Sequence, residues 1–292
     1  MLSIFNRMLN YLKIILLHCL PQHSLSRLIY RLTRIEFKPF KSFLINLFIR
    51  LYGVDMSLAL NTNPANYRSF NAFFTRKLKK NARNWVIDSS FILSPVDGAV
   101  SQIGYIDDCQ LLQAKNKKYS IEQLLGGDVT LARNFLNGSF ATLYLAPHDY
   151  HRIHMPVTGR LIKSIYVPGD LFPVNAVSVE NVNQLFARNE RFISIFETGL
   201  GLMAQIMVGA IFVGSMETVW LGEITPTKKR KLTIKEYNNQ SIKLNQADEF
   251  GHFNMGSTVI LLFQKDKLLW LPDIKKNSLI EVGQLLGNAI IQ

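Results

Sequence analysis

The sequence predicts an α+β fold in which amphipathic helices precede a mostly-β domain. Apolar residues recur at helical spacing in the first fifty residues, whereas short β-rich runs separated by Gly, Pro, Asn and Asp dominate from Phe91 onward. Of the 292 residues, 48% are hydrophobic and 18% are charged. This composition allows a substantial core and argues against disorder over most of the chain.

Three N-terminal segments have the periodicity of amphipathic helices. Apolar residues recur from Leu2 to Leu16, with basic residues among them, and Pro21 ends this segment. Ser24 is a candidate N-cap for a second helix over residues 25–32, and a third apolar-periodic stretch runs from Phe43 to Leu51.

None of these segments has the run of about 20 apolar residues that a bilayer-spanning helix needs, because Pro21 interrupts the longest charge-free stretch. Basic, aromatic and aliphatic residues mixed at helical spacing favour helices that lie in the plane of a membrane surface. The alternative is a helical layer packed on the rest of the protein.

The remainder of the chain reads as one helix followed by a β-rich body. The segment from Tyr67 to Lys80 has the pattern of a further amphipathic helix. Five runs have the composition of strands: Phe140 to Ala146, Leu161 to Val167, Phe192 to Phe196, Ile206 to Val213 and Thr258 to Phe263.

The charge balance indicates an anionic partner. Thirty-three basic residues against 21 acidic residues leave a net charge of +12, which suits either nucleic acid or anionic lipid. The basic run Lys228–Lys231 is typical of a solvated loop and can also contact either partner. Cys19 and Cys109 form no disulfide framework or metal cluster, so a reducing compartment is the default expectation.

Three of the six histidines fall in one short segment, at His148, His151 and His154. The cluster lacks the spacing of a helical zinc motif, so acid–base chemistry is favoured over metal binding, and we expect no metal. In an extended segment, His151 and His154 point to opposite faces because their separation is odd. The two histidines are therefore expected to do different jobs.

Three serines follow glycine, at Ser139, Ser215 and Ser257. A glycine lets another group approach the backbone closely, although Gly-Ser is also common in turns. A nucleophilic serine needs a base, and the base needs an orienting group. Asp97, one of the histidines and one of these serines can form such a triad, and the spacing does not choose among them.

Several segments, in this order, resemble the phosphatidylserine decarboxylases of the short bacterial type. The matching segments are Phe70–Arg76, Ser94–Ala99, Asp149–Pro156, Tyr166–Asn175, Leu185–Arg191 and Met255–Thr258. The family's self-cleavage signature is usually Leu-Gly-Ser-Thr. Met255 takes the place of its leucine, and Leu and Met interchange readily in apolar sites.

The resemblance implies a carboxy-lyase that is a zymogen and cuts its own chain between Gly256 and Ser257. It assigns Asp97, His154 and Ser257 to the self-cleavage triad, and His151 to substrate handling and proton donation. Ser257 then becomes a pyruvoyl cofactor, which forms a Schiff base with phosphatidylserine and allows release of CO2 and phosphatidylethanolamine.

The implied domain organisation is residues 1–65 as membrane-associating helices and residues 66–292 as the catalytic domain. Cleavage divides the precursor into a β chain, 1–256, and an α chain, 257–292. The expected partners are phosphatidylserine, an anionic membrane surface and the two chains of one precursor, with a homodimer allowed and no nucleic acid. The expected location is peripheral, at the cytoplasmic face of the cell membrane, in phospholipid biosynthesis.

Two rival interpretations come from other functional classes. A basic nucleic-acid or lipid-binding protein without chemistry explains the charge but not the ordered motifs. A serine hydrolase using Asp97, His154 and Ser257 acts on an external ester. Both rivals stay as one intact chain, whereas the decarboxylase becomes two pieces.

Overall fold

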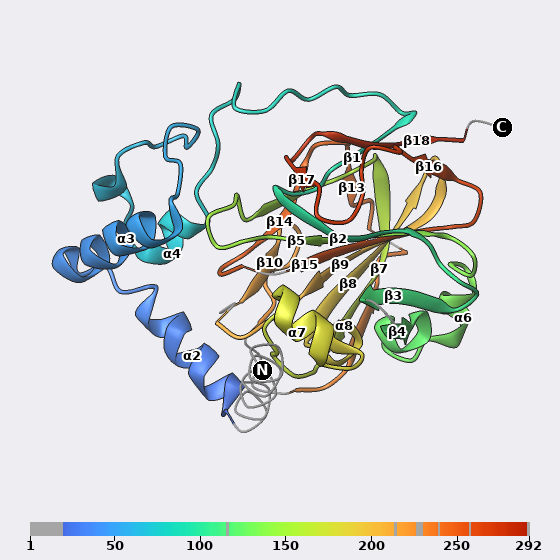
Figure 1. Ribbon diagram of the computed structural model, residues 1–292, viewed down its shortest axis with the longest axis horizontal. Helices are drawn as coiled ribbons and strands as arrows, with labels where there is room; N and C mark the ends of the chain where they lie inside the picture. The colour runs from blue at the N-terminus through green and yellow to red at the C-terminus, as the bar shows by residue number, and fades with distance from the viewer. Residues whose placement is uncertain are drawn as a thin grey trace, which may run out of the picture.

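A large antiparallel sheet forms the body of the protein, and the N-terminal helices extend to one side of it (Figure 1). The structure is a computed structural model that describes residues 20–114, 117–212, 215–225, 230–238, 240–256 and 258–290. The predicted α+β class, mostly β with helices at the N-terminal side, is confirmed.

The first helices precede all the strands, and the later helices are short and lie between strands. The helical elements are α2 (Gln22–Leu32), α3 (Lys38–Tyr52), η1 (Pro64–Asn66), α4 (Phe70–Phe74), α5 (Ile121–Leu124), α6 (Val129–Arg133), α7 (Ala176–Asn181) and α8 (Leu185–Arg188). The strands are β1 (Phe91–Leu93), β2 (Gly98–Tyr105), β3 (Gln110–Ala114), β4 (Lys117–Ser120), β5 (Ser139–Tyr144), β6 (Arg152–His154), β7 (Gly159–Val167), β8 (Arg191–Thr198), β9 (Gly201–Val208), β10 (Met216–Thr218), β11 (Gly222–Glu223), β12 (Thr233–Glu236), β13 (Lys243–Leu244), β14 (Glu249–Phe253), β15 (Thr258–Phe263), β16 (Leu268–Trp270), β17 (Leu279–Ile280) and β18 (Leu285–Ala289).

Strand β15 occupies a central place in the largest sheet, whose order is β12-β7-β8-β9-β15-β5-β2-β17 with β13 paired to β7. All six of its residues are buried and pair with both β9 and β5. Its sequence, Thr-Val-Ile-Leu-Leu-Phe, is a continuous apolar run after the first residue, which is typical of a strand covered on both faces. The predicted strand over these residues is confirmed.

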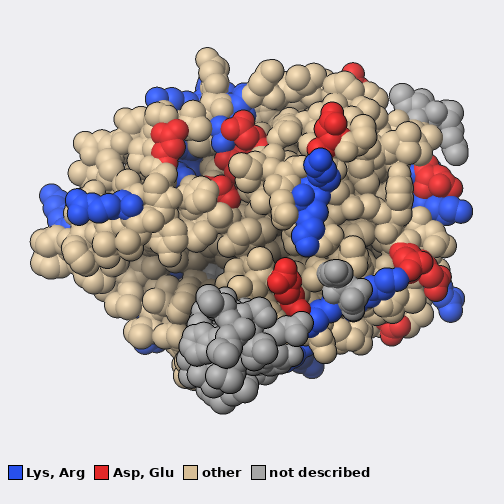
Figure 2. Space-filling view, in the orientation of Figure 1, with Lys and Arg blue, Asp and Glu red and all other residues tan. Residues whose placement is uncertain are grey.

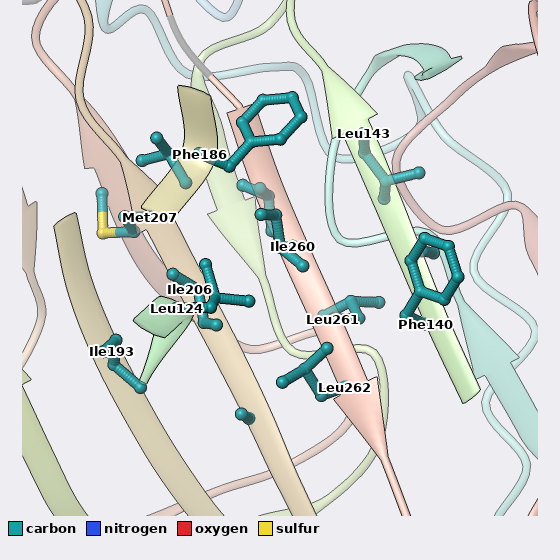
Figure 3. Packing of buried hydrophobic residues seen from close by; sticks show 14 of the residues in the cluster. Leu124, Phe140, Leu143, Phe186, Ile193, Ile206, Met207, Ile260, Leu261 and Leu262 are labelled. Atoms are coloured by element: carbon teal, nitrogen blue, oxygen red, sulfur yellow. The ribbon is translucent and has the colours of Figure 1, made fainter. Parts of the chain in front are cut away.

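The main core forms around β15. Figure 3 shows Ile260, Leu261 and Leu262 between the side chains of β5 on one side and those of β9 on the other. A smaller cluster joins α3 to α4 and to the residues before it, with Met255 packed against it. Met255 therefore links the helical side of the molecule to the segment that leads into β15.

The chain after β15 is tied into two sheets. Strand β17 pairs with β2 at the edge of the large sheet. Strands β16 and β18 form the three-stranded sheet β1-β18-β16. Residues 258–290 thus pair with strands from several regions earlier in the chain, which holds this segment in place independently of the peptide bond before it.

The predicted helix from Tyr67 to Lys80 is wrong, because only Phe70–Phe74 is α-helical. The side chain of Ser69 accepts the N–H of Ala72 and caps this short helix. Beyond it, the backbone bonds to an earlier segment: the N–H of Lys79 donates to Leu58 O and the N–H of Leu60 donates to Lys77 O. Tertiary pairing has overridden the helical periodicity here.

Two boundaries also differ from expectation. Helix α2 begins at Gln22, so Ser24 lies inside it rather than capping it, and Pro21 precedes its first turn. Strand β9 runs from Gly201 to Val208, earlier than the predicted Ile206 to Val213, because its register is set by the hairpin with β8. The predicted helix from Leu2 to Leu16 lies outside the described residues.

Helix α3 contains its predicted stretch, Phe43 to Leu51, but begins earlier, at Lys38, with Pro39 in its first turn. Over the residues that the structure covers, no helix combines the length and the apolar character needed to cross a bilayer.

Candidate active site

His151 and His154 lie on the segment that runs from the turn after β5 to the end of β6. The Asp149 carboxylate accepts the N–H of Ala146 at 2.6 Å, and the N–H of Asp149 donates to Ala146 O at 3.0 Å. These bonds close a tight turn after β5. Burial raises the pKa of the Asp149 carboxyl. The chain then passes through His151 into β6, which ends at His154.

His151 is fully buried beside Gly256. Its Nδ1 lies 2.8 Å from Asp149 O. A carbonyl can only accept, so Nδ1 carries the proton and Nε2 holds the lone pair. Among the described residues, Nε2 has no hydrogen-bond partner. A Cβ atom built on Gly256 would lie 2.9 Å from this nitrogen, so the basic nitrogen faces the residue before the predicted cleavage point.

The surroundings of His151 keep its ring neutral. Burial lowers its pKa to about 3, with the Arg76 guanidinium as the next cause, while the hydrogen bond to Asp149 O acts in the opposite direction. The Phe74 ring lies against the imidazole, with 4.1 Å between centroids. The His151 ring is therefore neutral at neutral pH, and its Nε2 is a hydrogen-bond acceptor.

His154 lies in different surroundings. Its Nδ1 is 2.8 Å from Ala247 O, and its Nε2 is 3.0 Å from the Tyr150 hydroxyl. The carbonyl again requires the proton on Nδ1, so Tyr150 donates to Nε2. The Trp85 ring lies 5.1 Å from the imidazole centroid. Burial lowers the pKa of His154, and its basic nitrogen is already hydrogen-bonded.

Asp97 is bound by an arginine rather than by a histidine. The Nε of Arg83 donates to Oδ1 at 3.2 Å, and its Nη2 donates to Oδ2. The backbone N–H of Val282 also donates to Oδ1, at 2.7 Å. In the described part of the chain, no hydrogen bond joins Asp97 to His154. The Asp97–His154 pairing of the predicted triad therefore stays a prediction.

Ser257 itself lies outside the described residues. Its neighbours are fixed on both sides. Asn254 accepts from the side-chain amide of Asn71 at 2.9 Å, and its backbone N–H donates to Ser215 O. Thr258 begins β15 and is fully buried. The predicted scissile bond thus falls in a short segment held at both ends.

The other candidate serines and the third clustered histidine lie in surroundings of their own. Ser139 is buried in β5, and Ser215 hydrogen-bonds to Glu223 at 2.6 Å. Within the ranges described, no three His, Cys, Asp or Glu side chains gather in an arrangement suited to a metal ion. His148 is half exposed and lies 3.4 Å from the Asp149 carboxylate.

Comparison with known proteins places the chain in a family. The family model described as phosphatidylserine decarboxylase matches residues 70–288, and a second model, described as PSD, matches residues 12–53. The chain belongs to the phosphatidylserine decarboxylase family.

Curated relatives match nearly the whole chain, and each is a phosphatidylserine decarboxylase proenzyme. The relative from Nitrosococcus oceani is 45% identical over 99% of this chain and 94% of its own length. The relative from Saccharophagus degradans is 47% identical over 92% of this chain and 94% of its own. The relative from Pseudoalteromonas translucida is 48% identical over 96% of both chains.

Sequence reasoning missed several residues that shape the site of this decarboxylase. Arg83 and Trp85 lie in an irregular segment without periodicity, and no local pattern indicated that they contact Asp97 and His154. Tyr150 and Arg76 belong to motifs that carry the family resemblance, but the motifs alone gave them no task. The sequence does not predict the contacts of these four residues, because their partners are brought close only by the fold.

Proposed function

We propose that the chain is a proenzyme that cuts itself between Gly256 and Ser257, and that the product converts phosphatidylserine to phosphatidylethanolamine and CO2. The observation that carries the decarboxylation part of the proposal is the buried, proton-free Nε2 of His151 beside Gly256, because His151 is the histidine assigned below to the substrate step. This nitrogen lies at the one peptide junction that the family resemblance marks for cleavage. The relatives' designation as proenzymes agrees with processing.

The residues around this junction fit a pyruvoyl group made from Ser257. Gly256 leaves no room for a side chain on the histidine side, and Nε2 of His151 offers a hydrogen-bond acceptor there. Thr258 would anchor the group through β15, and His151 would face it. When present, a pyruvoyl carbonyl supplies an acceptor for the electron pair left by departing CO2.

For self-cleavage, we assign His154 as the base that takes the Ser257 hydroxyl proton. Its Nδ1–H is fixed on Ala247 O, which leaves Nε2 as the accepting nitrogen. Burial lowers the pKa of His154 most strongly. The hydrogen bond to Ala247 O, the negative charge of Glu249 and, more weakly, that of Asp97 raise this pKa. Asp97 therefore favours the imidazolium through its field even without a direct hydrogen bond.

For decarboxylation, we assign His151 to the substrate side of the site. A neutral imidazole must accept a proton before it can donate one, and the ammonium group of the lipid head group is a suitable source. The phosphate and carboxylate of the head group raise the pKa of a nearby imidazole. His151 can then return the proton to carbon once CO2 has left.

Intact-mass analysis of purified protein tests the processing step. The wild-type chain of 33.4 kDa should appear as two pieces, one of them the 36-residue fragment 257–292, whose N-terminus reacts with carbonyl reagents. Ser257→Ala should remain one chain, because the attacking hydroxyl is gone.

The matched control is Ser139→Ala, which removes the hydroxyl from another Gly-Ser pair and should still be cut. A wild-type protein that decarboxylates phosphatidylserine as a single uncut chain would rule out the proposed processing. An uncut chain that hydrolyses external esters would instead indicate the serine hydrolase.

We also propose that α2 and α3 bind the protein peripherally to the anionic cytoplasmic face of the membrane. Large apolar side chains stand exposed on and between these helices: Leu28, Phe37, Phe43, Leu47, Leu51 and Tyr52. In Figure 2 this side of the molecule is mostly uncharged, with Lys and Arg at its outer edge. Such a surface combines insertion of apolar groups with attraction to anionic lipid.

An apolar groove of about 230 Å³ leads from this surface toward the cleavage junction. Leu47 and Leu51 of the exposed surface line it, together with Phe70 and with Met255, the residue before Gly256. The groove therefore offers a path along which a lipid can reach the site without leaving an apolar environment.

Replacing exposed apolar groups tests the membrane proposal. The double variant Phe43→Glu/Leu51→Glu should lower binding to anionic liposomes at least about tenfold, because each inserted side chain contributes about 1.5–3 kcal/mol. Leu279→Glu is the matched control, since Leu279 is 83% exposed on a strand outside the helices. Pelleting of the double variant equal to that of wild type would show that α2 and α3 are structural only.

A further inference from the structure

Arg76 is a buried cation that has no carboxylate partner in the described part of the chain. Its side chain is nearly inaccessible, with 5% of the residue exposed. Among the described residues, no Asp or Glu oxygen lies within 4 Å of its guanidinium, and its Nε and Nη1 have no hydrogen-bond partner. A buried, unpaired charge is unfavourable for folding, so its retention calls for another reason.

The side-chain hydrogen bonds that Arg76 makes with the described residues both go to the turn that carries His151, while its guanidinium also lies over the Phe73 ring, 5.6 Å from the centroid. Its Nη2 donates to His148 O at 2.8 Å and to Asp149 O at 3.3 Å. Asp149 O is the same atom that accepts the Nδ1–H of His151. One carbonyl therefore joins the guanidinium to the imidazole.

A second contact comes from the same short segment. Phe74, two residues before Arg76, places its ring against the His151 ring. Helix α4 and the residue pair after it thus fix the imidazole in two ways, by ring packing and by the shared carbonyl. The Phe70–Arg76 motif acquires a task that its sequence did not reveal.

We propose that Arg76 is a positioning residue that holds His151 in the neutral tautomer with Nε2 directed at residue 256. The guanidinium orients the Asp149 carbonyl, the carbonyl takes the Nδ1 proton, and the lone pair is left on the other nitrogen. The assignment rests on the proposed function for its catalytic consequence, but the tautomer itself does not.

The charge of Arg76 also favours the neutral form of the His151 ring. Burial is the main cause of the lowered pKa of His151, and two groups that can carry positive charge add to it: Arg76 from the segment after α4 and, more weakly, His148 from the turn. The Asp149 carboxylate is engaged by the N–H of Ala146. A positive neighbour disfavours the imidazolium, so loss of the Arg76 charge raises the pKa of His151.

Kinetics of Arg76 variants test the proposal in the processed enzyme. Arg76→Gln should be cut, should lose about 10- to 100-fold in kcat at neutral pH, and should show the acidic decline of kcat at higher pH than wild type. The sign follows from the neutral form being the active one: a higher pKa means that protonation begins to inactivate the enzyme sooner as pH falls. Arg76→Lys keeps the charge and should restore the wild-type acidic decline.

The matched control is Arg68→Gln, which removes the same charge from an exposed arginine on the same segment and should change neither kcat nor its pH profile. An Arg76→Gln enzyme with the wild-type rate and pH profile overturns the proposal. A wild-type protein that is never cut, or is inactive, refutes the proposed function instead.

Should Arg76→Gln fail to fold, nitrogen NMR of histidine-labelled Ser257→Ala precursor decides the matter without any activity. We expect the His151 signals of an Nδ1–H tautomer in the precursor and in its Arg76→Lys form. An Nε2–H tautomer in the precursor overturns the inference.

Discussion

His154→Ala should remain a single uncut chain, whereas His151→Ala should be cut and then decarboxylate about 10²–10⁴-fold more slowly than wild type. The two histidines share one short segment but not one environment. Nε2 of His154 accepts from Tyr150, and Nε2 of His151 faces Gly256. Gel analysis of freshly made protein followed by a CO2-release assay measures both steps.

His148→Ala is the control, because His148 lies in the same turn with its side chain half exposed. It should be cut and remain active. If His151→Ala is not cut while His154→Ala is, the roles are reversed, and the contact of His151 with Gly256 then marks the base of the cleavage step. If both variants lose folding together, the histidines act as structural residues.

Asp97→Ala should destabilise the protein by about 3–5 kcal/mol, because it removes the carboxylate that hydrogen-bonds the buried Arg83 guanidinium and leaves only the exposed Glu281 carboxylate, 3.9 Å away. Both side chains of the Arg83–Asp97 pair are almost covered, with 8% and 11% of their surface exposed. The same change removes the acceptor for the Val282 N–H. Urea unfolding in the Ser257→Ala background, where the chain stays whole, measures the loss.

Asp97→Asn distinguishes the structural role of Asp97, its bonds to Arg83 and Val282, from its predicted role in the triad. The amide oxygen can still accept from Val282, whereas the negative charge that acts on His154 is gone. Slow cleavage with a smaller loss of stability than in Asp97→Ala would support a role in catalysis. Cleavage of Asp97→Asn at the wild-type rate would show that Asp97 only connects Arg83 to the segment after β15.

The sequence predicted best what is decided locally. Strand β15 could be placed because six residues in a row are apolar or β-branched, and the long amphipathic α3 could be placed from its period. The helix predicted from Tyr67 to Lys80 was wrong because the backbone of residues 77–79 bonds to that of residues 58–60, a contact that no local pattern encodes.

The same distinction holds for the site. The odd separation of His151 and His154 indicated two environments, and in the structure their rings lie against different residues, Phe74 and Trp85. The partners of His154 were beyond prediction, because Ala247 and Trp85 come from distant irregular segments. The Arg83–Asp97 pair was equally hidden, since an arginine 14 residues earlier in a loop carries no signal of a buried contact.

Because β15 lies in the middle of the large sheet, the proposed cut would make unfolding of the protein irreversible. Before the cut, the strand inserts between β9 and β5 as part of a single chain (Figure 1). After it, an unfolded enzyme would have to recapture a 36-residue peptide from solution, and a fragment of that size does not fold alone. The mature protein would then persist through slow unfolding rather than through reversible refolding, so its lifetime is set by the barrier that keeps β15 between its neighbours.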